Sequence, residues 1–236
     1  MTPRTSAIVV AAGSGSRLGY GCAKAWAPLG GRPLLCHALE LLHSMDEVDE
    51  IVVVLREADV VQYAGEIAAR YEFPKVCTVV PGGARRQDSV RHGLASVYSR
   101  TQRVLVHDAA RPLADAALVR RTLAALDAEG VAGAIPAMPV TDTLKRVNGA
   151  RIVGTVDRST LVHVQTPQAF AYAPLFDAHM RARDTEADAT DDAALLEARG
   201  ECVVHVLGDA ANLKITYAQD LIVAEALLAA RTRTAL

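Results

Sequence analysis

Short apolar runs alternate with amphipathic segments along most of this chain, and this alternation constrains its fold more than any other feature. The apolar runs are rich in β-branched residues and have the length of strands; they span 7–12, 51–55, 76–80, 104–107, 132–137 and 202–207. Segments of helical periodicity lie between most of them, at 33–45, 58–71, 87–98 and 115–129. Strands and helices in alternation predict an α/β fold with a mostly parallel sheet and helices on both faces. Ligands of such sheets bind outside the carboxyl ends of the strands.

A glycine-rich loop follows the first apolar run directly, with the sequence AAGSGSRLG at residues 11–19. Because backbone N–H groups in such a loop form an anion-binding concavity, the loop is a candidate phosphate site. The dinucleotide fingerprint G-x-G-x-x-G is broken, since Leu18 stands where the third glycine belongs. The Gly-Lys-Ser/Thr sequence of a P-loop is absent as well. These departures disfavour a nicotinamide-dependent dehydrogenase and leave open which phosphate the loop binds.

Composition narrows the class of protein and its partners. A chain of 236 residues with no obvious linker predicts a single domain. The formal net charge of −2 predicts no general attraction to nucleic acid or to an anionic membrane. No apolar run approaches the ~20 residues of a membrane span. The 4 cysteines are scattered and include no Cys-x-x-Cys pair, which predicts a protein of the reducing cytoplasm without a disulfide or zinc site.

Lysine is rare among the 25 basic residues of the chain and occurs only as Lys24, Lys75, Lys145 and Lys214. A lysine retained in an arginine-rich chain can mark a place where a compact ammonium contacts phosphate, although chance explains any single one equally well. Arg17 lies inside the glycine loop, and Lys24 follows it in the chain. These two residues either place positive charge beside a triphosphate bound to the loop or are solvated charges next to a tight turn.

Two further segments carry candidate ligand-binding residues. Asp108 follows a buried strand in HDAARP, residues 107–112. One carboxylate at a strand end suits a Mg²⁺ ion that also binds substrate phosphates, and the alternatives are a helix cap or a partner for Arg111. In GGARRQDSV, residues 82–90, the glycine pair permits close approach of a flat ligand, and Ser89 can hydrogen-bond a base edge. An ordinary loop with a helix cap is the alternative there.

One stretch departs from the alternation of strands and helices. From TDTLKRV through Asn148-Gly149 to RIVGTVDR, the sequence predicts two short strands joined by a type I′ turn. Both strands are polar on both faces, and an isolated two-stranded hairpin is only marginally stable in water. We therefore expect a dimerisation arm at about 138–160 that packs against a second copy of the chain.

Seven short motifs extend over nearly the whole chain, from about residue 8 to about residue 228: AAGSGSRLG, VHDAARP, PVTDTLK, TVDRSTL, QTPQAF, TDDAALL and LKITYAQDL. In order and spacing they resemble those of the 2-C-methyl-D-erythritol 4-phosphate cytidylyltransferase family. The resemblance implies one nucleotidyltransferase domain over 1–236. Its fold would be a Rossmann-like three-layer α/β sandwich with a mostly parallel mixed sheet and a protruding β-hairpin arm. It also implies a homodimer that converts methylerythritol phosphate and CTP, with Mg²⁺, to 4-diphosphocytidyl-2-C-methyl-D-erythritol and pyrophosphate in the non-mevalonate isoprenoid pathway.

The resemblance also implies roles for single residues. The catalytic cations that contact the triphosphate would be Arg17, Lys24 and Lys214. The loop and base-binding residues of the nucleotide site would be Ala11, Ala12, Gly13, Gly15, Gly83 and Ser89. Asp108 would lie near Mg²⁺ and the sugar hydroxyls, and the other residues that bind the sugar phosphate would be Arg111, Thr166 and, from the neighbouring subunit, Thr143 and Arg158.

The chain departs from the family pattern most clearly around Lys24. This lysine usually follows proline and precedes glutamine, whereas here it lies in CAKAW. Ala84 and Ala211 replace polar or acidic residues of some relatives. These changes bear on substrate affinity more than on reaction type. Two other functions stay open, namely transfer to another sugar-alcohol phosphate such as ribitol 5-phosphate, and nucleotide binding without catalysis.

Overall fold

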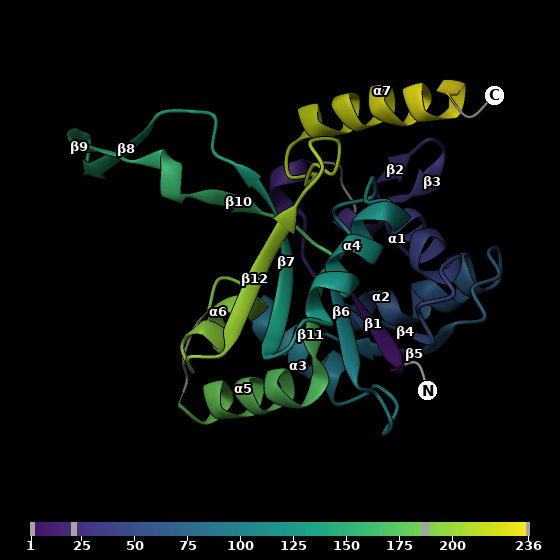
Figure 1. The fold of residues 1–236 in the computed structure, drawn as a ribbon. Coiled ribbons are helices and arrows are strands. Elements are labelled where there is room, and N and C mark those ends of the chain that lie inside the picture. Colours follow the sequence, from purple (N-terminus) through teal and green to yellow (C-terminus); the bar gives the residue numbers. More distant parts are fainter. Residues whose placement is uncertain (1–2, 20–22, 186–188, 235–236) are drawn as a thin grey trace.

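One eight-stranded sheet forms the centre of the computed structural model, which describes residues 3–19, 23–185 and 189–234 (Figure 1). The strand order is β10-β7-β11-β6-β1-β4-β5, and β12 pairs with β7. The strands are β1 (Thr5–Val10), β4 (Glu50–Leu55), β5 (Val76–Pro81), β6 (Arg103–Asp108), β7 (Val131–Pro139), β10 (Val162–Val164), β11 (Gln168–Ala171) and β12 (Cys202–Leu207). All six runs that the sequence predicts as strands are therefore confirmed.

The sheet is mixed and mostly parallel, as expected. The pairs β5–β4, β4–β1, β1–β6 and β12–β7 are parallel. The short strand β11 lies between β6 and β7 and is antiparallel to both, and β10 is antiparallel to the end of β7. Since β1, β4, β5 and β6 point the same way, their carboxyl ends meet at one edge of the sheet.

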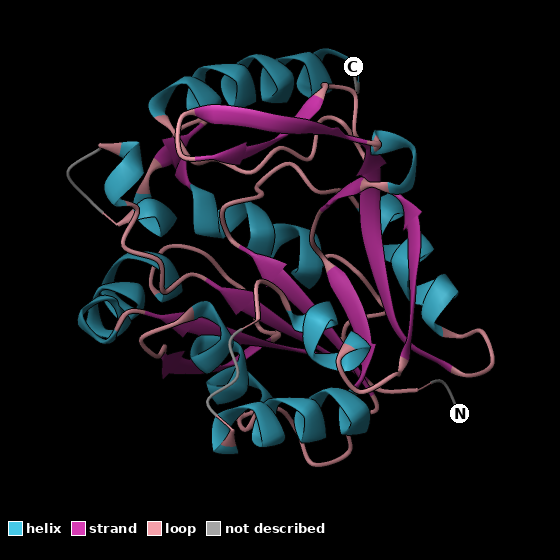
Figure 2. Cartoon of the chain, turned by 90° about the vertical axis from the view of Figure 1, so that its left-hand side faces the viewer, coloured by secondary structure: helices cyan, strands magenta, loops and turns pink. Residues whose placement is uncertain are grey.

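Helices cover both faces of the sheet, because successive strand residues point to opposite sides. Ala7 and Val9 of β1 belong to a buried cluster with residues of α1 and α4, whereas Ile8 belongs to a second cluster with residues of α3, α5 and α6. Figure 2 shows helices on either side of the strands, so the three-layer sandwich is confirmed. The helices are α1 (Leu34–His43), α2 (Glu57–Gln62), α3 (Arg86–Leu94), α4 (Ala116–Leu126), α5 (Tyr172–Asp184), α6 (Asp192–Glu197) and α7 (Ala218–Thr234).

The four predicted helices are all present, and two of them differ most from the sequence prediction in extent. The segment expected as one helix at 58–71 consists of α2 and a following π-helix, Tyr63–Ala68. The helix expected at 87–98 ends at Leu94. Beyond it the chain turns toward the sheet, where the Tyr98 N–H donates a hydrogen bond to the buried Glu50 carboxylate at 2.7 Å.

A third buried cluster joins α7 to the glycine loop. It contains Leu18 of the loop, Leu29 of the small hairpin β2 (Pro28–Leu29) and β3 (Arg32–Pro33), and Leu221 of α7. Leu18 is only 2% exposed. The residue that breaks the dinucleotide fingerprint is thus a hydrophobic anchor, and it holds the loop against the C-terminal helix.

The predicted hairpin is present as a separate two-stranded sheet, β8 (Leu144–Asn148) and β9 (Arg151–Val156), which projects from the body of the molecule (Figure 1). The prediction of its turn is off by one residue. Asn148 pairs with Arg151, so Gly149 and Ala150 occupy the turn. Gly149 has a φ of +57°, a left-handed conformation that glycine adopts without steric cost. A bulge between Arg146 and Val147 shifts the register of the two strands.

No helix in the described part of the chain combines the length and the apolar composition needed to cross a membrane.

Candidate active site

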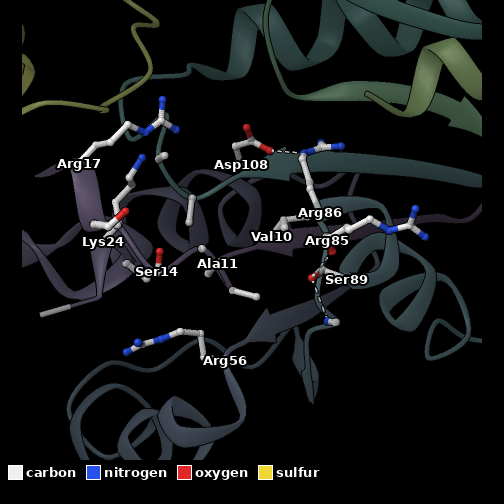
Figure 3. A pocket seen from close by; sticks show the side chains of 18 of the residues that line it. Val10, Ala11, Ser14, Arg17, Lys24, Arg56, Arg85, Arg86, Ser89 and Asp108 are labelled. Atoms are coloured by element: carbon white, nitrogen blue, oxygen red, sulfur yellow. Dashed lines mark hydrogen bonds and ion pairs between the residues drawn. The ribbon is translucent and has the colours of Figure 1, made fainter. Parts of the chain in front are cut away.

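A pocket of about 480 Å³ opens where the carboxyl ends of the parallel strands meet, as expected for this type of sheet. Figure 3 shows basic residues at both ends of the pocket, with Asp108 between them and Arg56 below. Arg17 and Lys24 lie at one end, and Arg85 and Arg86 lie at the other. Ten of the residues predicted from the sequence line it: Ala11, Ala12, Gly13, Gly15, Arg17, Lys24, Gly83, Ser89, Asp108 and Lys214.

The glycine loop approaches Lys24 closely. Gly15 has a φ of +69°, and a Cβ at this position would lie 2.7 Å from the backbone nitrogen of Lys24. Glycine is therefore required here both by backbone conformation and by space. Arg17 projects from the 3-10 helix Ser16–Leu18 that follows, whose Leu18 anchors the loop. The loop thus brings Arg17 and Lys24 to the same end of the pocket.

Lys24 begins the 3-10 helix Lys24–Trp26, and its ammonium donates a hydrogen bond to the Ile215 carbonyl at 2.8 Å. Burial lowers the pKa of Lys24, and the positive charges of Lys214 and Arg17 lower it further. The flanking alanines that depart from the family pattern, Ala23 and Ala25, are both buried. Both belong to the buried cluster that also contains Val9 of β1 and residues of α1, so the lysine segment packs against the core.

Asp108 lies at the end of β6 between two cations. Its Oδ2 accepts from the Lys214 ammonium at 2.6 Å, and its Oδ1 accepts from Arg86 Nε at 3.1 Å. Burial by itself would raise the pKa of Asp108, but Arg86 and Lys214 outweigh that effect and hold the pKa far below its ordinary value. The carboxylate is therefore charged throughout the physiological pH range. Its partners are Arg86 and Lys214 and not Arg111, the alternative partner that the sequence offered.

Lys214 reaches the pocket on the segment that precedes α7. The Ile215 N–H donates to the Ala110 carbonyl at 2.8 Å, which ties this segment to the loop after β6. Asn212, fully buried, donates from its side-chain amide to the Thr166 carbonyl at 2.9 Å. Hydrogen bonds made by Asn212 before it and by Ile215 after it thus hold Lys214 at the pocket.

Thr166 and Arg111 lie behind the pocket and are not among the residues that line it. The Thr166 hydroxyl accepts from the Asp108 backbone N–H at 3.0 Å and contacts Nδ1 of His107 at 3.0 Å. Arg111 donates to the carbonyls of Asn212 and Val164. Thr166 therefore braces the backbone at Asp108, whereas Arg111 ties the loop after β6 to the segments that contain Val164 and Asn212. Burial lowers the pKa of His107 to about 4, so this side chain is neutral at physiological pH.

The segment 82–89 closes the other end of the pocket. A Cβ on Gly82 would lie 2.4 Å from the Ala12 Cβ and 2.7 Å from the Ser89 hydroxyl, so the two loops touch here. The Ser89 hydroxyl accepts from the Gly83 N–H at 3.1 Å and donates to the Arg85 carbonyl at 3.2 Å. This geometry leaves one lone pair of the hydroxyl for a ligand.

The arm residues lie away from this pocket within the chain. Arg158 lines a separate pocket at the base of the arm with Val140 and His205, and its guanidinium donates to the Thr141 carbonyl. Thr143 is exposed at the start of the arm. Lys145 on β8 donates to the Thr155 hydroxyl at 2.7 Å. The chain therefore does not bring Thr143 or Arg158 to its own pocket.

Arg86 lines the pocket and was not among the residues predicted from the sequence. It occupies the first position of α3 and contacts two carboxylates, Asp108 and Asp192. Little in the sequence distinguishes Arg86, because arginine is the common basic residue of this chain. The distinctive residues of the segment GGARRQDSV are its glycines and its serine. Arg56 and Arg85 also line the pocket and were likewise not predicted.

The donor set bears on the expected metal. Asp108 is the one carboxylate among the described residues that line the pocket, and no group of three or more His, Cys, Asp or Glu side chains suited to a metal occurs in the described part of the chain. Mg²⁺ commonly binds through one or two carboxylates together with substrate phosphates and water. The residues present therefore fit a Mg²⁺ ion that arrives on a nucleotide, and they do not form a cage that binds the ion alone.

Comparisons with known proteins agree on one family. The family model of 2-C-methyl-D-erythritol 4-phosphate cytidylyltransferase, IspD, matches residues 5–230. The chain is 42% identical over 222 residues to the protein of that name from Syntrophotalea carbinolica, a match that covers 94% of both chains. It is 48% identical over 233 residues to the bifunctional enzyme IspD/IspF of Clavibacter michiganensis subsp. michiganensis, covering 96% of this chain and 55% of that protein.

A solved structure agrees with these matches. The 4-diphosphocytidyl-2C-methyl-D-erythritol synthase from Anaerococcus prevotii superimposes with a TM-score of 0.82 at 31% sequence identity, covering 97% of this chain and 99% of that one. The chain therefore belongs to the 2-C-methyl-D-erythritol 4-phosphate cytidylyltransferase (IspD) family.

Proposed function

We propose that residues 1–236 act as one nucleotidyltransferase domain that joins CTP and 2-C-methyl-D-erythritol 4-phosphate to form 4-diphosphocytidyl-2-C-methyl-D-erythritol and pyrophosphate. The observation that carries this proposal is that Arg17 of the glycine-rich loop, the nearby Lys24 and the distant Lys214 all line one pocket. A triphosphate is the polyanion that such a cluster fits best.

The reaction follows from the charges of the pocket. An oxygen of the sugar phosphate attacks the α-phosphorus of CTP and forms a new P–O bond. The bond from the α-phosphorus to the bridging oxygen breaks, and pyrophosphate leaves with that electron pair. Because the attacking phosphate is already ionised, no general base is required, in accord with the neutral, buried His107. What the protein must supply is orientation and positive charge fixed in advance.

Arg17, Lys24 and Lys214 supply that charge at the triphosphate. Lys24 is held against the Ile215 carbonyl, and Lys214 is held against Asp108. These contacts position both ammonium groups before a ligand binds, so little reorganisation is needed as negative charge shifts toward the leaving pyrophosphate. A Mg²⁺ ion on the nucleotide, with Asp108 as its protein neighbour, would neutralise further phosphate charge.

The other end of the pocket receives cytosine and ribose in this proposal. Ala11 and Ala12 follow β1, and Gly83 with Ser89 faces them. Small side chains and a glycine allow a flat base to lie against backbone, and the free lone pair of Ser89 accepts from a base amino group. Cytosine carries such an amino group, whereas uracil does not.

The hairpin arm completes the site from a second copy of the chain. The expectation that the arm is polar on both faces is wrong, because Val147, Ile152 and Val153 are more than half exposed on it, which is costly for apolar side chains unless another surface covers them. Thr143 and Arg158 would then reach the sugar phosphate in the partner's pocket. Thr166 acts through the backbone of Asp108, and Arg111 acts through the segment that precedes Lys214, whose Asn212 carbonyl it contacts.

A reducing compartment suits the described cysteines. Cys36, Cys77 and Cys202 are all free thiols. We therefore propose that the enzyme works in the cytoplasm.

Release of pyrophosphate tests the proposed function. The protein is incubated with Mg²⁺ and with CTP, ATP, GTP or UTP, each in the presence of methylerythritol phosphate, of ribitol 5-phosphate, or of neither. We expect release that requires methylerythritol phosphate and is fastest with CTP. Faster release with ribitol 5-phosphate would overturn the sugar-phosphate assignment, and CTP binding without release would favour a catalytically silent protein.

A further inference from the structure

A line of buried charges leads from the pocket into the helical layer on one face of the sheet. Arg86 Nη1 lies 2.7 Å from Asp192 Oδ2, and Asp192 Oδ1 lies 3.0 Å from His179 Nε2. Arg86, Asp192 and His179 belong to α3, α6 and α5 respectively. At the pocket end, Arg86 contacts Asp108. Three helices therefore meet behind one carboxylate of the site.

The inner members of this line are almost fully shielded from solvent. The side chains of His179 and Asp192 are 0% and 1% exposed, whereas the side chain of Arg86 is 27% exposed. An ionised carboxylate accepts hydrogen bonds and has no proton to donate. The Nε2 of His179 must therefore carry the proton in its contact with Asp192. Burial by itself would raise the pKa of Asp192, but Arg86 and the His179 hydrogen bond outweigh it and hold the pKa below its ordinary value. Asp192 is therefore a buried charge with two partners.

These contacts fix the orientation of Arg86. A guanidinium is a rigid planar fork, and two carboxylates from different elements, Asp108 at the end of β6 and Asp192 on α6, bind two of its nitrogens. With both contacts made, the side chain has little freedom to swing into or out of the pocket. Asp108 in turn holds Lys214, whose side chain is 44% exposed and would otherwise be mobile. The line thus ends at an ammonium that the proposed mechanism uses.

We propose that Asp192 and His179 are positioning residues: they hold Arg86, and through Arg86 they orient the Asp108 carboxylate and the Lys214 ammonium. This inference rests on the proposed function, because it treats Asp108 and Lys214 as parts of the transferase site. Neither Asp192 nor His179 lines the pocket, so neither touches substrate.

Steady-state kinetics on Asp192→Asn test the proposal, because asparagine keeps the shape and removes the charge. We expect kcat/KM for methylerythritol phosphate to fall by roughly 10- to 100-fold, the size of effect that a small misplacement of reacting groups produces. The KM for CTP should change much less than kcat/KM for methylerythritol phosphate, since Lys214 is only one of three cations at the triphosphate and the Ser89 contact to the base does not pass through Asp108. A merely structural role of Asp192 would raise the KM values of both substrates together. A proportional rise in both KM values, or unchanged kinetics, would overturn the proposal.

A double-mutant cycle shows whether Asp192 acts through Arg86. In an Arg86→Gln background, Asp192→Asn should cause no further loss of kcat/KM, because the contact it supports is already gone. The double variant should also melt at a higher temperature than Arg86→Gln alone, since the single change leaves the Asp192 charge buried without its cation. Losses that multiply in the double variant would contradict action through Arg86.

Substitutions at His179 give an independent series if Asp192→Asn folds poorly. His179→Gln retains a donor near the Nε2 position and should keep kcat/KM within about 3-fold, whereas His179→Leu removes it and should lower the same parameter by about 10-fold. Equal activity of the two variants would contradict the role of the hydrogen bond. Asp177→Asn is the control, since it breaks the ion pair of α5 with Arg199, 2.7 Å away, which does not lead to the pocket.

The same experiment separates the two proposals. A wild-type protein that releases no pyrophosphate from CTP and methylerythritol phosphate contradicts the proposed function and, with it, the role of this line in transfer. An active wild type with unaltered Asp192→Asn kinetics contradicts only the positioning role.

Discussion

The Lys214 ammonium lies 2.6 Å from the Asp108 carboxylate, although 106 positions separate the two residues in the sequence. The contact joins the end of β6 to the segment before α7 at the mouth of the pocket. It holds one cation of the proposed triphosphate site in place before a nucleotide arrives. A preorganised charge of this kind stabilises a transition state without the cost of reorganisation.

Replacing Lys24 by alanine should lower kcat by on the order of 10²–10³, the usual loss when one preorganised donor is removed. Pyrophosphate release measures the rate, and thermal unfolding establishes that the variant is folded. Lys75→Ala is the matched control, because Lys75 donates to the Met45 carbonyl and lies outside the pocket. Comparable losses in the two variants would remove Lys24 from the mechanism.

The activity should decline at alkaline pH earlier than an ordinary lysine would allow. Burial, with Lys214 and Arg17 nearby, lowers the pKa of Lys24, so its ammonium loses its proton at a lower pH than a solvated lysine. The profile of kcat/KM for CTP reports this group in the free enzyme. Lys24→Arg should move the alkaline limb to higher pH. An unchanged limb in that variant would assign it to another group.

Gly82→Ala should weaken CTP binding, because the new Cβ would lie 2.4 Å from Ala12 and 2.7 Å from the Ser89 hydroxyl. Relief of this clash must separate the two loops that bind the base. We expect KM for CTP to rise by about 10-fold or more, with a smaller change in KM for the sugar phosphate. Steady-state kinetics with each substrate varied in turn give both values. A normal KM for CTP would show that the base lies elsewhere.

Stability in acid should depend on Asp88. The Arg85 side chain hydrogen-bonds this carboxylate and lowers its pKa to about 2. Because the native pKa is depressed, the stabilisation is present above pH ~4 and is lost as the pH falls through about 2. Asp88→Asn should therefore reduce the free energy of unfolding by about 1 kcal/mol at pH 7, through loss of a negative charge that pairs with Arg85 and Arg91 in the first turn of α3. Denaturant titrations should show the difference shrinking toward pH 2, and a constant difference would contradict the account.

Mixing two inactive variants tests whether the site is shared between subunits. Lys24→Ala disables the pocket, and Arg158→Ala disables the arm. If the arm serves the partner's pocket, a mixed dimer regains one intact site, so random exchange should restore about a quarter of the wild-type sites. Pyrophosphate release before and after exchange measures the recovery. Activity that stays at the level of the separate variants would place Arg158 in its own chain's site or outside the site altogether.

The layers of the fold were predictable because their signals are local. Runs such as Ile51–Leu55 are β-branched and bounded by helical periodicity, and they appear as strands in the central sheet. The strand β11 was not predictable in the same way, since its sequence QAFA lacks β-branched residues. It is a strand because β6 and β7 pair with it from both sides.

The site was predictable where a residue lies in a distinctive motif and not where long-range contacts define it. Arg17, Lys24 and Asp108 stand out in glycine-rich or strand-end segments, and the structure brings them to one pocket. Arg86 and Asp192 gain their importance from each other, across 106 positions of sequence. Burial and pairing give these residues their chemistry, and neither property is visible in the residue types alone.

The fate of the α-phosphorus tests the central claim most directly. The protein is incubated with Mg²⁺, methylerythritol phosphate and CTP labelled at the α-phosphorus, and the products are separated. The account predicts that the label appears in a diphosphocytidyl sugar alcohol, with unlabelled pyrophosphate formed in equal amount. Label in free CMP, or label that stays in CTP while the protein binds the nucleotide, would contradict cytidylyl transfer by this pocket.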